Sequence, residues 1–234
     1  MAGSDKSIWI IANWKSNKTI AETLDWVSSV GSKLPKREDL KVVVCPTFSA
    51  LSEVKKAITV GNFPIMVGSQ DLSPFEAGAY TGEESASLLK ELVELSIIGH
   101  SERRKNFSET DEMISKKVKR ANEAGITPLV CVQDEETPVP EECKMIAYEP
   151  IWAISTGLTN TPGVGRADTP EDANKLAIRF KQKYGKELEV IYGGSVTATN
   201  VKGFIIQSDI DGVLVGNASL DAEEFIKILK ACKE

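Results

Sequence analysis

The sequence predicts an α/β fold in which eight parallel strands alternate with helices and close into a (β/α)8 barrel. Eight short and nearly continuous apolar runs are spread over the 234 residues, and this is the pattern of strands buried on both faces. Amphipathic stretches alternate with them, which gives parallel units with right-handed crossovers. Eight such units favour a closed barrel over the alternative, an open doubly wound sheet.

The predicted elements follow one another from end to end of the chain. The strands are expected at residues 7–12, 41–45, 65–69, 95–99, 126–132, 145–149, 189–192 and 212–215. The helices are expected at residues 21–34, 49–58, 83–94, 109–124, 170–184, 198–206 and 220–232. Ser108, Thr169 and Ser219 stand where three of these helices begin, and such residues are favoured N-caps. We find no internal repeat or linker and assign residues 1–234 to one domain.

The unit after the fifth strand lacks a convincing helix. Residues 133–144 are acidic, and Pro138 and Pro140 interrupt them. Proline breaks a helix interior, so we expect this helix to be shortened or absent. A barrel strand without its helix exposes apolar surface. We expect something else, such as a neighbouring subunit, to cover it.

Composition and charge exclude several classes of function. The net charge is -6 and no basic block offsets it, which argues against binding to nucleic acid or to an anionic membrane. No apolar run approaches the roughly 18 residues of a membrane span, and residues 1–6 lack the pattern of a secretory signal. We expect a cytoplasmic, soluble protein. The cysteines, namely Cys45, Cys131, Cys143 and Cys232, are scattered and favour free thiols over disulfides or zinc.

Three predicted strands end in side chains suited to acid–base chemistry, and in a barrel the active site lies at the carboxyl ends of the strands. Asn13 and Lys15 follow the first strand and could orient and neutralise an anionic ligand; the plain alternative is a solvated lysine. His100, the only histidine, follows the fourth strand and precedes a helical-looking turn that would oppose a second proton. It could instead simply cap its own turn.

Glu149 ends the sixth predicted strand, and Pro150 behind it prevents further pairing. A carboxylate at this point could act as a base, or it could be a solvated loop glutamate. Glycine-rich segments follow the last two strands, at residues 192–195 and 212–219. Such barrels often hold phosphate there on backbone amides, so two such ends favour a phosphate site over plain turns.

Six motifs in order resemble the triosephosphate isomerase family, and the resemblance runs from Ile10 to Leu229. The motifs, with Gln70 between the first two, are Asn13-Trp14-Lys15, Gly78-Ala79-Tyr80-Thr81-Gly82-Glu83, Gly99-His100-Ser101-Glu102-Arg103-Arg104, Tyr148-Glu149-Pro150-Ile151-Trp152-Ala153-Ile154, Tyr192-Gly193-Gly194-Ser195-Val196 and Asp211-Gly212-Val213-Leu214-Val215-Gly216.

The resemblance implies a TIM barrel enzyme of glycolysis and gluconeogenesis. It would interconvert dihydroxyacetone phosphate and D-glyceraldehyde 3-phosphate through an enediolate, without cofactor or metal. By this likeness Glu149 would abstract the carbon-bound proton, neutral His100 would polarise the carbonyl, Lys15 would stabilise the enediolate and Asn13 would orient the substrate. Ser101 and Glu102 would support these groups without contacting the substrate, with Glu102 near Lys15. The backbone amides implied to hold the phosphate are those of Ser155, Ser195, Gly216 and Asn217.

The resemblance also implies a homo-oligomer, a dimer or higher. Thr81, on the loop at residues 78–82, would support Asn13 and His100 of a partner chain. The sequence departs from the family pattern at Ser155 and Asn217, which replace glycines, at Gln133-Asp134, which replace Gly-Glu, and at residues 158–168, which lengthen the lid that starts at Pro150.

Two other functions remain open at this level. One is another phosphosugar isomerase or lyase on the same scaffold, since a fold alone does not fix function. The other is a phosphate-binding barrel without catalysis or with altered activity. Asn13, Lys15, His100 and Glu149 are all present, and a binding module would need no general base.

Overall fold

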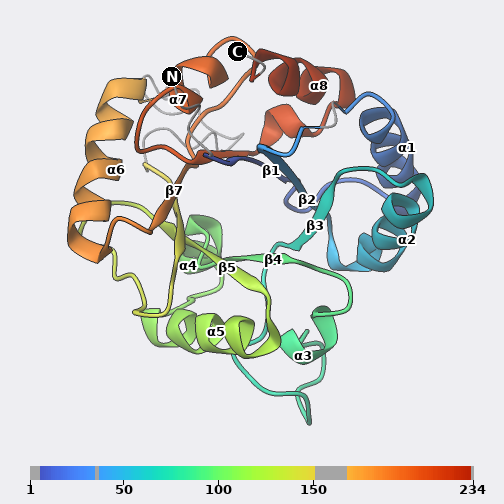
Figure 1. The fold of residues 1–234 in the computed structure, drawn as a ribbon. Coiled ribbons are helices and arrows are strands. Elements are labelled where there is room, and N and C mark those ends of the chain that lie inside the picture. Colours follow the sequence, from blue (N-terminus) through green and yellow to red (C-terminus); the bar gives the residue numbers. More distant parts are fainter. Residues whose placement is uncertain (1–5, 35–36, 151–167, 233–234) are drawn as a thin grey trace.

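The computed structural model describes residues 6–34, 37–150 and 168–232. Its eight parallel strands form a closed barrel in sequence order, and β8 returns to pair with β1 (Figure 1). The strands are β1 (Ile8–Asn13), β2 (Leu40–Cys45), β3 (Met66–Ser69), β4 (Leu95–Ile98), β5 (Thr127–Val132), β6 (Met145–Tyr148), β7 (Glu189–Tyr192) and β8 (Gly212–Val215). The predicted barrel is confirmed, and each predicted strand is found.

The apolar runs are continuous because each strand is buried on both faces. In β1, Trp9 and Ile11 point into the barrel with side chains such as Leu95, while Ile10 and Ala12 pack outward against the helices. One cluster therefore fills the barrel and the other joins the barrel to its helical layer.

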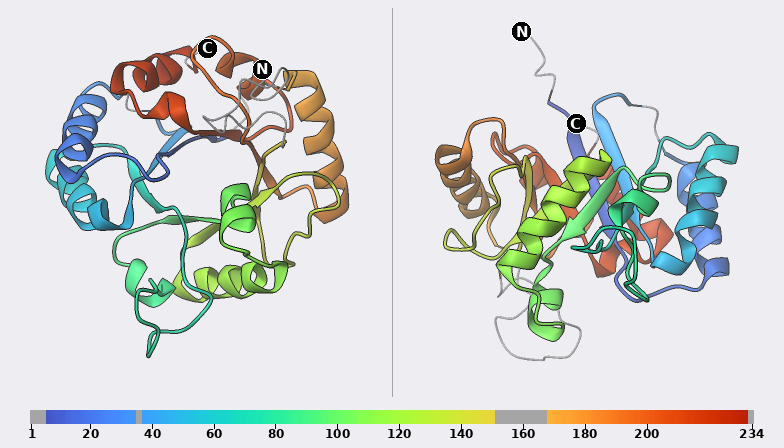
Figure 2. Two further views of the ribbon diagram at one scale, coloured as in Figure 1. Left: turned by 180° about the vertical axis from the view of Figure 1, so that it is seen from behind. Right: turned by 90° about the horizontal axis from the view of Figure 1, so that it is seen from below.

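Helices surround the barrel as an outer ring (Figure 1). They are α1 (Ile20–Gly31), α2 (Leu51–Gly61), α3 (Ala86–Leu89), α4 (Ser101–Asn106), α5 (Asp111–Ala124), α6 (Pro170–Tyr184), α7 (Val201–Ile205) and α8 (Ala222–Ala231), with the 3-10 turns η1 (Phe48–Ala50) and η3 (Asn217–Ser219). The exception is α4, which lies over one end of the barrel, inside the ring (Figures 1 and 2). Since α4 follows β4, this is the carboxyl end.

Two predicted helices are much shorter in the structure. The helix expected at residues 83–94 is reduced to α3, because the backbone carbonyl of Glu84 accepts a hydrogen bond from the N–H of Ser73 and so belongs to the preceding loop. The helix expected at residues 198–206 is reduced to α7. There the side chain of Asn200 accepts from the N–H of Thr197 and donates to the carbonyl of Ser195, which keeps the chain in a turn until the helix starts.

The N-caps were predicted correctly only in part. Thr169 caps α6 by accepting from the N–H of Asp172 at 3.1 Å. Ser108 does not cap α5; its φ is 55°, and Thr110 is the N-cap. Ser219 does not cap α8, because its hydroxyl donates to the carbonyl of Gly216 and Asp221 is the N-cap. In both wrong cases a polar residue two positions later takes the role.

Residues 133–144 form turns and no helix, as the sequence predicts. The segment nevertheless covers its own strands and does not leave them bare. Cys143 is buried and Val139 packs on the core. On the outside, Glu135 binds Arg179 of α6 at 2.7 Å, and Asn122 of α5 donates to the carbonyl of Glu142 at 3.2 Å. Contrary to that expectation, no neighbouring subunit is needed to cover this surface.

All four cysteines are free and buried. Among the described residues, no helix is long and apolar enough to cross a membrane.

Candidate active site

Glu149 and His100 lie in direct contact at the carboxyl end of the barrel. The Nε2 atom of His100 is 3.0 Å from Oε1 of Glu149, and the N–H of Ser101 approaches Oε2 of Glu149 at 3.3 Å. Both side chains are buried. Gly99 brings His100 there: its φ is +69°, and it turns the chain from β4 directly into α4.

The carboxylate of Glu149 is held in its ionised form. Burial by itself would raise the pKa of Glu149, but His100, the N–H of Ser101 and Lys15 together lower it below its ordinary value. Gly193 leaves room for this side chain, because a Cβ at that position would lie 2.8 Å from Cγ of Glu149. A carboxylate that is buried and ionised can accept a proton.

His100 experiences opposing influences. Its Nδ1 accepts the N–H of Glu102 at 3.2 Å as the N-cap of α4, so this nitrogen carries no proton and Nε2–H faces Glu149. Burial lowers the pKa of His100, but Glu149, with a smaller contribution from Glu102, raises it, and the pKa lies above its ordinary value. The helix start was predicted correctly. The prediction that the ring stays neutral because of the helix start is not supported for this ligand-free arrangement, because the two carboxylates shift the pKa in the opposite direction.

We expect the imidazole of His100 to titrate above about 6.5, the ordinary value for histidine, in the ligand-free protein. In E149Q the midpoint should fall below that of the wild type, since burial and the helix start remain while the opposing carboxylate is gone. Because the chain has one histidine, nitrogen NMR reports this ring without assignment.

The matched control is E189Q, at the other end of the barrel, where Glu189 accepts from Trp9 at 2.9 Å. The titration midpoint of His100 in E189Q should equal the midpoint in the wild type. An E149Q midpoint at or above the wild-type midpoint would contradict the assignment of Glu149 as the source of the shift.

Lys15 is anchored from three directions. Its N–H donates to the side chain of Asn13 at 3.1 Å, its carbonyl accepts from Gln70 at 2.8 Å, and its Nζ lies 2.5 Å from Oε1 of Glu102. Its φ is 54°, a strained value for a residue other than glycine. The structure therefore fixes the direction of this ammonium by main-chain and side-chain contacts, and it brings Glu102 to Lys15 as the resemblance implies.

A cavity of about 150 Å³ lies between these groups and the last two strands. It is lined on one side by Asn13, Lys15, His100 and Glu149, and on the other by residues 193–197 and 216–218, which include Ser195, Gly216 and Asn217. The described non-glycine residues with positive φ are Lys15, Lys18, Asn62 and Ser108, so the asparagine at 217 occupies ordinary backbone space. A side chain is tolerated there without strain.

The remaining predicted residues do not line this cavity. Ser155, Trp152 and the insertion at residues 158–167 lie outside the described residues. Thr81 is exposed on its own chain. Asp134, at one departure from the family pattern, accepts from the N–H groups of Glu136 and Thr137 in its own turn. Its carboxylate is therefore already engaged locally.

Gln70 also supports the site, although the sequence predicted no role for it. It joins the carbonyls of Lys15 and Cys45. The available signal was its place directly after β3, at the same end of the barrel. No group of three or more metal-ligating side chains occurs in the part of the chain that the structure describes.

Comparison with known proteins agrees with this geometry. The family model described as "Triosephosphate isomerase" matches residues 8–232. A triosephosphate isomerase of Alkaliphilus oremlandii is 42% identical, over 94% of this chain and 97% of the relative. One from Dehalococcoides mccartyi is 38% identical over 96% of both chains, and one from Mesomycoplasma hyopneumoniae is 37% identical over 94% of this chain and 97% of the relative.

Proposed function

The chain belongs to the triosephosphate isomerase family, and from this premise we propose how its residues carry out the reaction. The protein is an isomerase that interconverts dihydroxyacetone phosphate and D-glyceraldehyde 3-phosphate. The observation that carries the proposal is the contact between Glu149 and His100 beside Lys15 at the wall of one cavity.

Glu149 acts as the base. Proton abstraction from a carbon next to a carbonyl needs an ionised carboxylate near the substrate, and the lowered pKa of Glu149 supplies one. In the ligand-free site its two oxygens contact Nε2 of His100 at 3.0 Å and the N–H of Ser101 at 3.3 Å, so the carboxylate has to leave these contacts before it reacts.

His100 polarises the carbonyl and moves protons between the two substrate oxygens. Its Nε2–H now faces Glu149; a bound substrate would take that position and receive the hydrogen bond. The Nδ1 acceptor role at the start of α4 keeps the ring from gaining a second proton once the carboxylate has turned away.

Lys15 stabilises the negative charge of the enediolate, and Asn13 orients the substrate beside it. The phosphate is held by backbone amides of Ser195, Gly216 and Asn217, where two adjacent strand ends and the start of η3 meet Lys15. Ser155 is proposed as a further donor on the basis of the family resemblance alone. The lid that contains it would exclude water from the enediolate.

The alternative of a phosphate-binding barrel without catalysis is disfavoured. A binding module gains nothing from a buried base that contacts the only histidine. A cytoplasmic location stays a prediction.

We further propose that the active unit is a two-fold dimer. Residues 73–85 project from the barrel as a long loop (Figure 1). Within it, Phe75 and Tyr80 stack with ring centroids 4.3 Å apart, yet they are 40% and 45% exposed. A separate hollow of about 350 Å³ lies beside Lys15 and is lined by Phe48 and Phe107 among others. A projecting loop and an open hollow near the site suit reciprocal insertion between two copies.

The wild-type protein should therefore sediment as a dimer at assay concentration. T81R places bulk and charge at the tip of the loop, next to the ammonium of Lys15 in the partner, and should shift sedimentation toward monomer with about a tenfold loss of specific activity. V60R, at a position of α2 that is 87% exposed, is the control and should change neither. A fully active wild-type monomer would overturn the proposal.

A further inference from the structure

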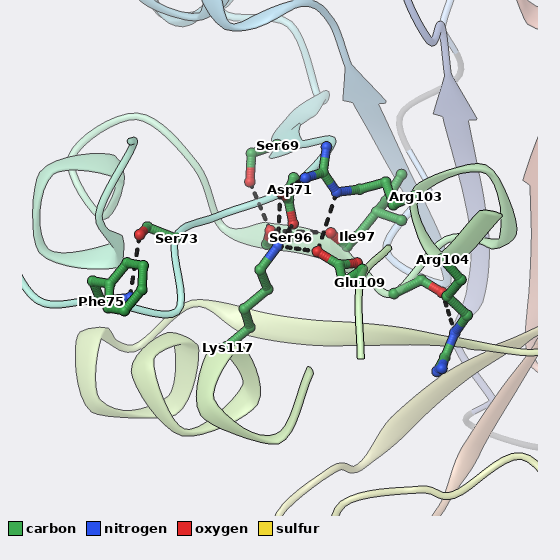
Figure 3. A network of polar contacts seen from close by, with 11 residues as sticks. Ser69, Asp71, Ser73, Phe75, Ser96, Ile97, Arg103, Arg104, Glu109 and Lys117 are labelled. Carbon is green, nitrogen blue, oxygen red and sulfur yellow. Dashed lines mark hydrogen bonds and ion pairs between the residues drawn. The ribbon is translucent and has the colours of Figure 1, made fainter. Parts of the chain in front are cut away.

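Four charged side chains form a cluster in which Asp71, Glu109 and Lys117 are buried and Arg103 is partly exposed (Figure 3). Lys117 contacts both oxygens of Asp71, at 2.6 and 2.8 Å, and also contacts Glu109. Arg103 lies 2.9 Å from Asp71 and 3.2 Å from Glu109. The two negative charges balance the two positive charges, and the side chain of Lys117 is only 2% exposed.

The cluster joins three separate segments of the chain. Asp71 follows β3, Arg103 belongs to α4, Glu109 precedes α5, and Lys117 extends from α5 toward the others (Figure 3). The charged groups that act on Asp71 are Lys117, Arg103 and Glu109. The cluster thus fixes α4 relative to the end of β3.

Burial works against the ionised form of Asp71. Burial, helped by Glu109, raises the pKa of Asp71 from 3.8 to about 6, although Lys117 and Arg103 oppose the shift. Because the pKa is higher in the folded state, ionisation of Asp71 costs folding free energy as the pH rises from 3.8 to about 6. Above about pH 6 the carboxylate is nevertheless ionised and stays paired with Lys117 and Arg103.

Each partner of the Asp71–Arg103 ion pair is linked by hydrogen bonds, its own or those of its neighbour in sequence, to a residue proposed to be catalytic. Gln70, the neighbour of Asp71, donates to the carbonyl of Lys15. The N–H of Arg103 donates to the carbonyl of His100 at 2.8 Å, and Glu102, the neighbour of Arg103, binds the ammonium of Lys15. Lys15 and α4 are thus held to each other through this one ion pair as well as through Glu102.

We propose that Asp71 is a positioning residue for catalysis: its ionised carboxylate holds Arg103, and thereby α4, so that His100 and Glu102 keep their places relative to Lys15. This inference rests on the proposed roles of His100 and Lys15. In this role Asp71 does not act on the substrate directly. It acts through Arg103 on one side and through Gln70 on the other.

The test is D71N, which keeps the shape of the side chain and removes its charge. At pH 8 we expect kcat/KM of the folded D71N protein to fall about tenfold, mainly in kcat. As the pH falls below about 6, Asp71 of the wild type becomes protonated, so the ratio of wild-type to D71N activity should shrink toward one. The nitrogen signals of His100 should also shift at pH 8.

The matched control is D211N. Asp211 is a buried carboxylate 2.8 Å from Lys181, but it stands at the start of β8, at the opposite end of the barrel. D211N should leave the nitrogen signals of His100 unchanged and keep kcat/KM within about twofold of the wild-type value.

Two outcomes would overturn the inference: unchanged kcat/KM in D71N, or a constant activity ratio across the pH range. The E149Q variant, assayed in the same series, reports on the proposed function separately. Near-normal turnover in E149Q would reject the catalytic assignment whatever D71N does, whereas an inactive E149Q with a normal D71N rejects only the role of Asp71.

Discussion

The E149Q variant is expected to lose about three orders of magnitude in kcat, because an amide cannot accept the carbon-bound proton. The loss should appear in kcat and kcat/KM alike, since the missing interaction is made in the transition state. The amide has nearly the shape of the carboxylate, so the cavity and the glycine at position 193 beside it should remain as they are.

Steady-state kinetics together with the affinity of a phosphate-bearing inhibitor make this test specific. Inhibitor binding should survive in E149Q, because the proposed phosphate contacts lie at Ser195, Gly216 and Asn217. E189Q carries the same chemical change at the other end of the barrel and should keep normal turnover. If E149Q turns over like the wild type, Glu149 is not the base.

The K15M variant should show the second largest effect, a loss of about a hundredfold to a thousandfold in kcat/KM. The ammonium lines the cavity and is held by Glu102, while Asn13 and Gln70 bind the strained main chain of Lys15. The ammonium attracts both the phosphate of the substrate and the enediolate. Its loss should therefore raise KM and also lower kcat. This split distinguishes Lys15 from Glu149, whose loss should leave binding largely intact.

K18M is the matched control for K15M. Lys18 also has a positive φ, of 71°, but its Nζ lies 5.5 Å above the ring of Trp14 and does not line the cavity. Its removal should change kcat/KM by less than about twofold. The double variant K15M/E102Q separates two causes, since K15M alone leaves the carboxylate of Glu102 without its partner at 2.5 Å. Equal activity of the single and double variants would attribute the whole loss to the missing ammonium, and normal activity of K15M would reject the electrostatic role.

The sequence by itself determined the barrel and the candidates for its active site. Strands buried on both faces read as continuous apolar runs, and this signal is local, so each strand was found within one residue at either end. Parallel strands also send all their carboxyl ends to one side. Asn13, Lys15, His100 and Glu149, which are far apart in the chain, could therefore be assigned to one site before any contact was known.

The tertiary structure decided what depends on partners distant in sequence. The lengths of α3 and α7 follow from hydrogen bonds at Ser73 and Asn200 that compete with the helix. The pKa of His100 depends on Glu149, which stands on another strand 3.0 Å away. The pairing of Asp71 with Lys117 had no sequence signal, because an aspartate and a lysine far apart in the chain look like two solvated charges until the fold buries them together. Local patterns fix which segments form strands and where they end; the energy of a buried charge is fixed only by what the folded chain packs against it.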